Sequence, residues 1–214
     1  MAMISARAAL EALRAGNQRF VSKLGLESGP ALGAGAARPP RYELPLGRQE
    51  PLAIVLGCSD ARVPAEIVFD QGLGDLFVIR VAGNIVAPSQ IGSVEFAASA
   101  FGTRLVVVLG HSSCGAVHAT LEQLARPSTE QSRNLRSIVD RIRPAVAGLL
   151  ERRPPPDPAT LEQQAVLANI RMAVEQLRHG SEVLEQLIEE GLRVVGAEYS
   201  LETGLVEFLE DISA

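Results

Sequence analysis

Three short runs of aliphatic and β-branched residues constrain the fold of this chain most strongly. They are residues 52–57 (LAIVLG), 76–81 (LFVIRV) and 105–110 (LVVVLG). Their apolar residues follow one another instead of alternating with polar ones, which is typical of strands buried on both faces of a parallel sheet. Residues 88–101 (PSQIGSVEFAASAF) predict a helix with proline in its first turn, between the second and third strands. The order predicts an α/β fold, with a mostly parallel central sheet flanked by helices and a right-handed crossover.

The N-terminal part predicts a helical arm followed by a loop. A helix over residues 5–15 would begin at Ser5 as its N-cap and end at Gly16. Residues 29–40 (GPALGAGAARPP) are rich in glycine and proline and predict a loop. Because such an arm seldom closes a core by itself, we expect it to pack on a second subunit.

The C-terminal part predicts helices and then two edge strands. A helical region over residues 116–150 would be broken at Pro127 and Pro144, and residues 151–158 (ERRPPPDP) would form a stiff linker. Helices over 159–190 are followed by strands over 192–199 and 205–209, which a turn at 202–204 would join as a hairpin. We therefore predict a single domain over 1–214, with an arm and loop at 1–40 and an α/β core at 51–214.

Charge and hydropathy narrow the possible partners. The 20 Lys and Arg residues against 25 Asp and Glu residues leave a net charge of -5. Nucleic acids and anionic membranes require a basic surface, so we expect neither as a partner. No apolar run approaches the roughly 20 residues that a membrane-spanning helix needs. The N-terminal segment has no continuous apolar stretch and no small-residue cleavage site, which predicts a cytoplasmic protein.

Two clusters of chemically active residues directly follow predicted strands. Residues 58–62 (CSDAR) follow the first strand, and residues 111–115 (HSSCG) follow the third. Ligands of open parallel sheets bind beyond the carboxyl ends of the strands, so Cys58, His111 and Cys114 converge if the two strands are neighbours. Two thiolates and one imidazole are typical zinc ligands, and three protein ligands leave the open position of a catalytic site. A disulfide between the cysteines is the alternative, which a cytoplasmic domain does not need.

Asp60 and Arg62 have two interpretations. They can form an ion pair that caps a helix, because residues 64–66 (PAE) are typical of a helix start. Alternatively, Asp60 has two states in a zinc site. It either takes the fourth zinc position, or it pairs with Arg62 and leaves that position to water.

These motifs resemble the beta-class carbonic anhydrases of bacteria. The resemblance rests on C-x-D-x-R at 58–62, LGDLFVIRVAGN at 73–84 and GHSSCGAV at 110–117, and it extends to GNQRFV at 16–21 and GLVEF at 204–208. It implies the reversible hydration of carbon dioxide to bicarbonate and a proton, with one zinc per chain. It also implies a homodimer or a dimer of dimers, with the N-terminal arm crossing to the neighbour.

The resemblance assigns roles to individual residues. Cys58, His111 and Cys114 would hold zinc, and Asp60 and Arg62 would orient the attacking water, with Asp60 a zinc ligand in the closed state only. The substrate pocket would include Val63, Phe69, Gln71 and Gly115. Some bacterial members also have a bicarbonate pocket built from Trp, Arg and Tyr. Arg80 and Tyr199 fall near two of its positions, but the chain contains no Trp, so we expect that pocket to be absent or built differently.

Two alternative functions use the same residues. One is a non-catalytic zinc-binding or sensor protein, although a structural site has no use for the pair of Asp60 and Arg62. The other is a related zinc enzyme that acts on a small linear substrate such as carbon disulfide.

Overall fold

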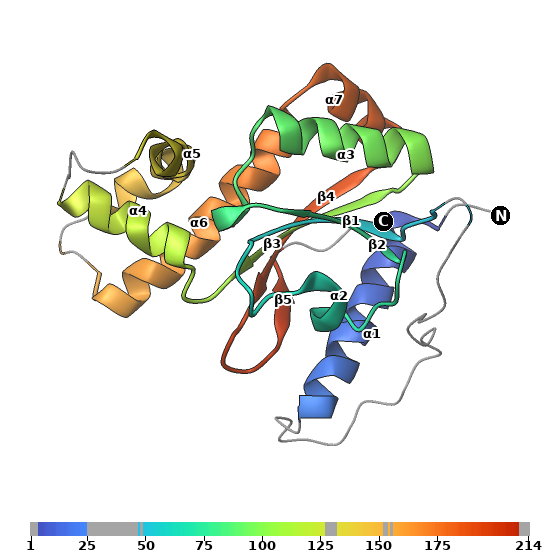
Figure 1. Ribbon diagram of the computed structural model, residues 1–214, viewed down its shortest axis with the longest axis horizontal. Helices are drawn as coiled ribbons and strands as arrows, with labels where there is room; N and C mark the ends of the chain where they lie inside the picture. Colours follow the sequence, from blue (N-terminus) through green and yellow to red (C-terminus); the bar gives the residue numbers. More distant parts are fainter. Residues whose placement is uncertain are drawn as a thin grey trace.

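A five-stranded sheet with the strand order β2-β1-β3-β4-β5 forms the centre of the protein (Figure 1). The computed structural model describes residues 4–24, 47, 49–126, 132–151, 154 and 156–209. The strands span Ala53–Gly57 (β1), Leu76–Arg80 (β2), Leu105–His111 (β3), Arg193–Tyr199 (β4) and Val206–Phe208 (β5). All neighbouring strands are parallel except β4 and β5, which form the predicted hairpin. The predicted α/β fold with a mostly parallel sheet is confirmed.

The three apolar runs occupy the positions that their sequences predict. Every residue of β1 and β3 is buried, whereas most residues of the edge strand β2 are partly exposed. β1 and β3 are hydrogen-bonded neighbours, with Val55 in register with Val107. The segments that follow these two strands therefore meet at one edge of the sheet, as the site prediction requires.

Helices cover both faces of the sheet. Alternate strand residues divide the buried apolar side chains into two clusters, one on each face. Figure 1 shows α1 and α2 on one side of the sheet and α3, α6 and α7 on the other. The helices span Ala6–Leu24 (α1), Ala65–Val68 (α2), Pro88–Phe101 (α3), Gly115–Ala125 (α4), Arg133–Leu150 (α5), Pro158–Arg178 (α6) and Glu182–Glu189 (α7), with a 3-10 turn at Ala82–Asn84 (η1). Within the described ranges, no helix combines the length and apolar character needed to cross a bilayer.

The N-terminal helix differs from its prediction in two ways. Gly16 does not end α1, which continues to Leu24. Gly16 instead lies where the helix touches the backbone carbonyl of Phe69, a contact too close for a Cβ atom. In addition, the buried side chains of α1, among them Leu10 and Leu13, pack on the chain's own sheet. In this structure α1 thus covers its own core, which the prediction of an arm on a second subunit did not anticipate.

One further prediction needs correction. Pro144 lies inside α5 and does not break it, because the buried side chains of Ile142 and Val146 hold the helix against its neighbours on both sides of the proline. The predicted helix at 88–101 is α3, which connects β2 to β3 across β1, the strand that lies between them. Pro127, the loop at 29–40 and part of the linker at 151–158 lie outside the described residues.

Candidate metal centre

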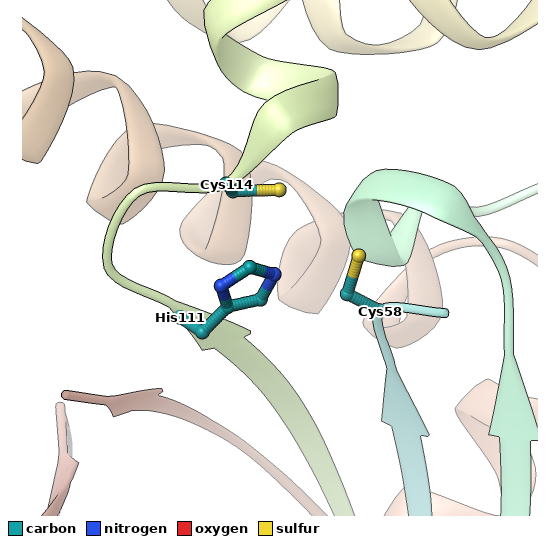
Figure 2. Close-up of side chains that lie close together, drawn as sticks. All are labelled: Cys58, His111 and Cys114. Atoms are coloured by element: carbon teal, nitrogen blue, oxygen red, sulfur yellow. The ribbon is translucent and has the colours of Figure 1, made fainter. Parts of the chain in front are cut away.

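Cys58, His111 and Cys114 converge at the carboxyl ends of β1 and β3, as their sequence positions predict. Cys58 directly follows β1, His111 is the last residue of β3, and Cys114 is the N-cap of α4. Their ligand atoms all lie within 4.8 Å of one another, and all three residues are buried. Figure 2 shows the two sulfur atoms and the imidazole edge facing a common point. Both cysteines are free, so the alternative of a disulfide is wrong in this structure.

The turn between His111 and Cys114 brings both side chains to the same side. Ser113 has a positive φ of 53°, a left-handed conformation that tightens the turn. Ser112 anchors the turn, because its N–H donates to the carbonyl of Tyr199 at 3.0 Å and its Oγ accepts from the N–H of Leu201 at 2.9 Å. The position of the two ligands therefore depends on the β4–β5 hairpin as well as on β3.

The ring of His111 is oriented for binding a cation. Its Nδ1 lies 2.9 Å from the carbonyl oxygen of Ser112, which can only accept, so Nδ1 carries the proton and Nε2 keeps its lone pair. Nε2 is buried and has no hydrogen-bond partner among the described residues. Burial lowers the pKa of His111, but the neighbouring Cys58 thiolate and the Ser112 carbonyl outweigh burial and raise the pKa above its ordinary value.

Cys58 receives support from η1 and α6, which the sequence analysis missed. The N–H of Gly83 donates to the Cys58 sulfur at 3.3 Å, and the side chain of Asn169 donates to the carbonyl of Gly83 at 2.8 Å. Asn169 lies on the buried face of α6 and is only 3% exposed. A polar residue within that apolar stripe was the available sequence signal, because buried amides almost always have a specific partner.

The two sulfurs hold one proton between them in the absence of a cation. A hydrogen bond from the Cys114 thiol, the strongest influence, lowers the pKa of Cys58 to about 4. The same hydrogen bond and burial raise the pKa of Cys114. A divalent cation would replace this proton and satisfy the orphaned Nε2 of His111. Two sulfurs and one imidazole nitrogen fit zinc, for which they are typical ligands.

Asp60 and Arg62 form a close ion pair beside the three ligands. The guanidinium of Arg62 donates to both carboxylate oxygens of Asp60 at 2.9 and 2.7 Å, and the Arg62 N–H donates to one of them at 2.9 Å. These bonds hold the pKa of Asp60 well below its usual range. The pair does not cap α2, whose N-cap is Pro64 without a side-chain bond. Asp60 Oδ2 lies 3.9 Å from Nε2 of His111, so the carboxylate borders the ligand cluster.

Arg80 also holds the loop at 58–62. Its Nε donates to the carbonyl of Cys58 at 3.1 Å, and its Nη2 donates to the carbonyl of Asp60 at 2.6 Å. The sequence position of Arg80 indicated a bicarbonate pocket and gave no sign of these contacts. They follow from the pairing of β1 with β2, which places Arg80 next to Gly57.

The four residues predicted for the substrate pocket lie in different environments. Gly115 begins α4 directly after Cys114. Val63 and Phe69 are 2% and 0% exposed and belong to a different core cluster from Cys58 and Cys114. Gln71 donates to the carbonyl of Phe69 at 2.7 Å. Within one chain, the structure thus brings Gly115 to the ligands and places Val63 and Phe69 in the other core cluster.

The fold and the site together define an α/β protein with a candidate three-ligand metal centre at the carboxyl ends of parallel strands. A family model described as carbonic anhydrase matches residues 53–206. The chain is 38% identical to carbonic anhydrase 2 of Mycobacterium tuberculosis, over 92% of this chain and 89% of that protein. It is also 38% identical to the carbonic anhydrase of Mycolicibacterium smegmatis, over 94% and 91% of the two chains. The chain belongs to the carbonic anhydrase family, in its beta class.

Solved structures agree with this assignment. The beta-carbonic anhydrase CcaA superposes with a TM-score of 0.67 at 26% identity, over 78% of this chain and 80% of that chain. A beta-carbonic anhydrase from Sordaria macrospora, described as tetrameric, superposes with a TM-score of 0.66 at 24% identity, over 78% and 84% of the two chains. The second likeness supports the fold alone.

Proposed function

We propose that this protein catalyses the reversible hydration of carbon dioxide to bicarbonate and a proton, with one zinc ion held by Cys58, His111 and Cys114. The observation that carries the proposal is the Asp60–Arg62 pair at the border of a three-ligand cluster. Three protein ligands leave a position open, and a carboxylate held next to that position can orient a reactant there. A metal site with only a structural task would need no such pair.

Each residue of the site has a task in this reaction. When bound, zinc would supply a Lewis acid that generates the nucleophile from water near neutral pH. Asp60 stays deprotonated because of Arg62, so its carboxylate accepts a hydrogen bond from the attacking water and orients it. The water oxygen forms a bond with the carbon of carbon dioxide, and the proton of the water leaves to solvent. Arg62 keeps Asp60 in the accepting position.

The substrate would bind next to this water. We propose that Gly115, which follows the ligand Cys114, lines the substrate pocket where the small residue leaves room for carbon dioxide. Among the described residues, no atom beyond the adjoining stretch of α4 lies within 4 Å of the position of a Cβ at Gly115. Val63, Phe69 and Gln71 stay predicted pocket residues, and the burial of Val63 and Phe69 in a different core cluster from Cys58 and Cys114 is the reason to test them separately.

The assembly and location are part of the same proposal. We propose a homodimer or a dimer of dimers as the working unit, as the resemblance to the beta-class carbonic anhydrases implies. We also propose a cytoplasmic location, because two free cysteines that serve as metal ligands suit a reducing compartment.

Zinc analysis together with stopped-flow hydration of carbon dioxide at about pH 8.5 tests the proposal, since this pH lies above the usual pKa of about 7 for water activated by zinc. One zinc per chain with rapid hydration is the expected result. Zinc without hydration contradicts the proposal, and turnover of carbon disulfide under the same conditions then distinguishes a related enzyme from a non-catalytic zinc protein. Absence of zinc from the purified chain contradicts the metal assignment itself.

A further inference from the structure

Arg80 links the edge strand β2 to the loop that carries Asp60. It is the last residue of β2 and pairs in register with Gly57, the last residue of β1. Its guanidinium therefore reaches past the end of β1 and donates to the carbonyls of Cys58 and Asp60, at 3.1 and 2.6 Å. Hydrogen bonds from a charged donor are stronger than neutral ones. Two of them to carbonyls only two residues apart fix the path of the loop.

The loop has to be fixed because the Asp60 carboxylate can bind at two positions, on the guanidinium of Arg62 or at the fourth metal position. The carboxylate is held by Arg62, whose side chain is 57% exposed, and an exposed ion pair is weakened by water. At the same time, Asp60 Oδ2 lies only 3.9 Å from the metal-facing Nε2 of His111. Carboxylate oxygens are good zinc ligands, so a small displacement of the loop would let Asp60 occupy the fourth metal position.

We propose that Arg80 is a positioning residue that keeps Asp60 on Arg62 and thereby keeps the fourth position of the metal centre open. The inference rests on the proposed function, because it requires a metal held by Cys58, His111 and Cys114. The carbonyl of Asp60 also accepts the N–H of Val63 at 3.0 Å, but this bond lies within the loop and moves with it. Arg80 acts from a neighbouring strand and so fixes the loop relative to the sheet.

Cobalt substitution gives a direct readout of the open position. Co²⁺ replaces zinc in the wild-type protein and in R80M and R80Q, and azide is titrated while the visible spectrum is recorded. Azide changes the spectrum only where a metal position is open to it. We expect at least about a tenfold weaker apparent azide affinity in R80M, since two charge-assisted hydrogen bonds are lost. R80Q keeps one neutral donor group, the side-chain amide, and its azide affinity should lie between those of the wild type and R80M.

Two further variants separate positioning from a general structural role. Arg193 is a matched control, because it lies at the start of β4 and donates to the carbonyls of Ile188 and Leu192. R193M should keep the wild-type azide response. The double variant R80M/D60N replaces the competing carboxylate by a weaker ligand, so its azide response should return towards that of the wild type.

The outcomes distinguish this inference from the proposed function. A wild-type azide response in R80M with one cobalt per chain overturns the positioning role, and so does an R80M/D60N variant that stays unresponsive. If R80M binds no cobalt, the test passes to R80Q. An azide response in R80Q equal to that of the wild type then overturns the positioning role of Arg80. Failure of the proposed function has a different signature, since the wild-type protein itself would then bind no metal or hydrate no carbon dioxide.

Discussion

The turn at 111–114 and the loop at 58–62 both carry proposed metal ligands, but they are held in different ways. In the turn, His111 and Cys114 are only 0% and 1% exposed, whereas Ser113 between them is exposed. Neutral hydrogen bonds from Ser112 tie the turn to the β4–β5 hairpin. In the loop, Cys58 is buried, but the residues after it reach the surface. There the charged side chains of Arg62 and Arg80 hold the loop in place.

This difference separates rigid from adjustable parts of the site. A turn that neutral hydrogen bonds tie to a neighbouring hairpin, and whose end residues His111 and Cys114 are buried, has little freedom to move, so its candidate ligands are preorganised for the cation. A loop held by hydrated charges can move by small amounts, because water replaces such contacts at little cost in free energy. Substitutions in the turn should therefore abolish the site, whereas substitutions in the loop should leave the metal and change the reaction.

The largest effect is expected at His111. His111→Gln removes the proposed imidazole ligand, so we expect little bound zinc. The hydration rate should fall by more than the roughly 100-fold that is typical when a metal site loses a supporting hydrogen bond. Metal analysis and stopped flow measure both. His118→Gln is the matched control, because His118 lies on α4 with 56% of its side chain exposed. One zinc per chain in His111→Gln would remove this residue from the ligand set.

Asp60 tests the adjustable part of the site. Asp60→Ala should keep one zinc per chain, because all three proposed ligands stay, but it should lose about 100-fold in kcat, as expected for a misplaced reactant. Asp140→Ala is the control, since Asp140 pairs with Arg143 on the exposed side of α5. Wild-type turnover in Asp60→Ala contradicts the proposed orientation of water. Loss of zinc in the same variant contradicts the division between turn and loop.

Gly83 connects the two regions, because its N–H donates to Cys58 and its Cα lies next to Ala116 of α4. In Gly83→Ala, the positive φ of 69° and the contact with Ile142 should lower the free energy of unfolding by about 2 kcal/mol. Urea denaturation measures the change. Gly148→Ala in α5 is the matched control, because no described atom beyond the adjoining stretch of the helix lies within 4 Å of its Cβ position. This substitution should raise the free energy of unfolding by about 1 kcal/mol. Equal changes in the free energy of unfolding for Gly83→Ala and Gly148→Ala would exclude local crowding as the cause of the destabilisation.

Asp70 tests the charged support of the segment that follows α2. Burial raises its pKa, but the bonds from Lys23 and Arg19 outweigh burial and hold the pKa below the ordinary 3.8. A lowered pKa in the folded state means that the stabilisation is present above about pH 4 and is lost as the pH falls through the folded pKa. Asp70→Asn should therefore lower the free energy of unfolding by about 1 kcal/mol at pH 7.

The difference between wild type and Asp70→Asn should be smaller near pH 2 than at pH 7, because Asp70 gains a proton as the pH falls through its folded pKa. Paired urea titrations at the two pH values measure it. Asp140→Asn, at a pair exposed on both sides, should change the stability little at either pH. A difference for Asp70→Asn that is the same at both pH values would show that packing, and not charge, is responsible.

Much of the site was predictable because its signals are local. A continuous apolar run identifies a buried strand, and ligand-type residues directly after such a run must lie at its carboxyl end. This reasoning predicted Cys58, His111 and Cys114 correctly as neighbours. It failed at Gly16 and Pro144, where local preference indicated the end or a break of a helix. There the packing of apolar side chains along the helix outweighs the intrinsic preference of one residue.

The amino-acid sequence alone specified the strands, the two segments with metal ligands and the pairing of Asp60 with Arg62, because each depends on residues close together in the chain. Tertiary structure alone determined which distant groups support them. Arg80 bonds to Cys58 across 22 positions of the chain, and Asn169 bonds to Gly83 across 86. These contacts depend on the register of β1 with β2 and on the placement of α6, which result from packing the whole core and not from any local pattern.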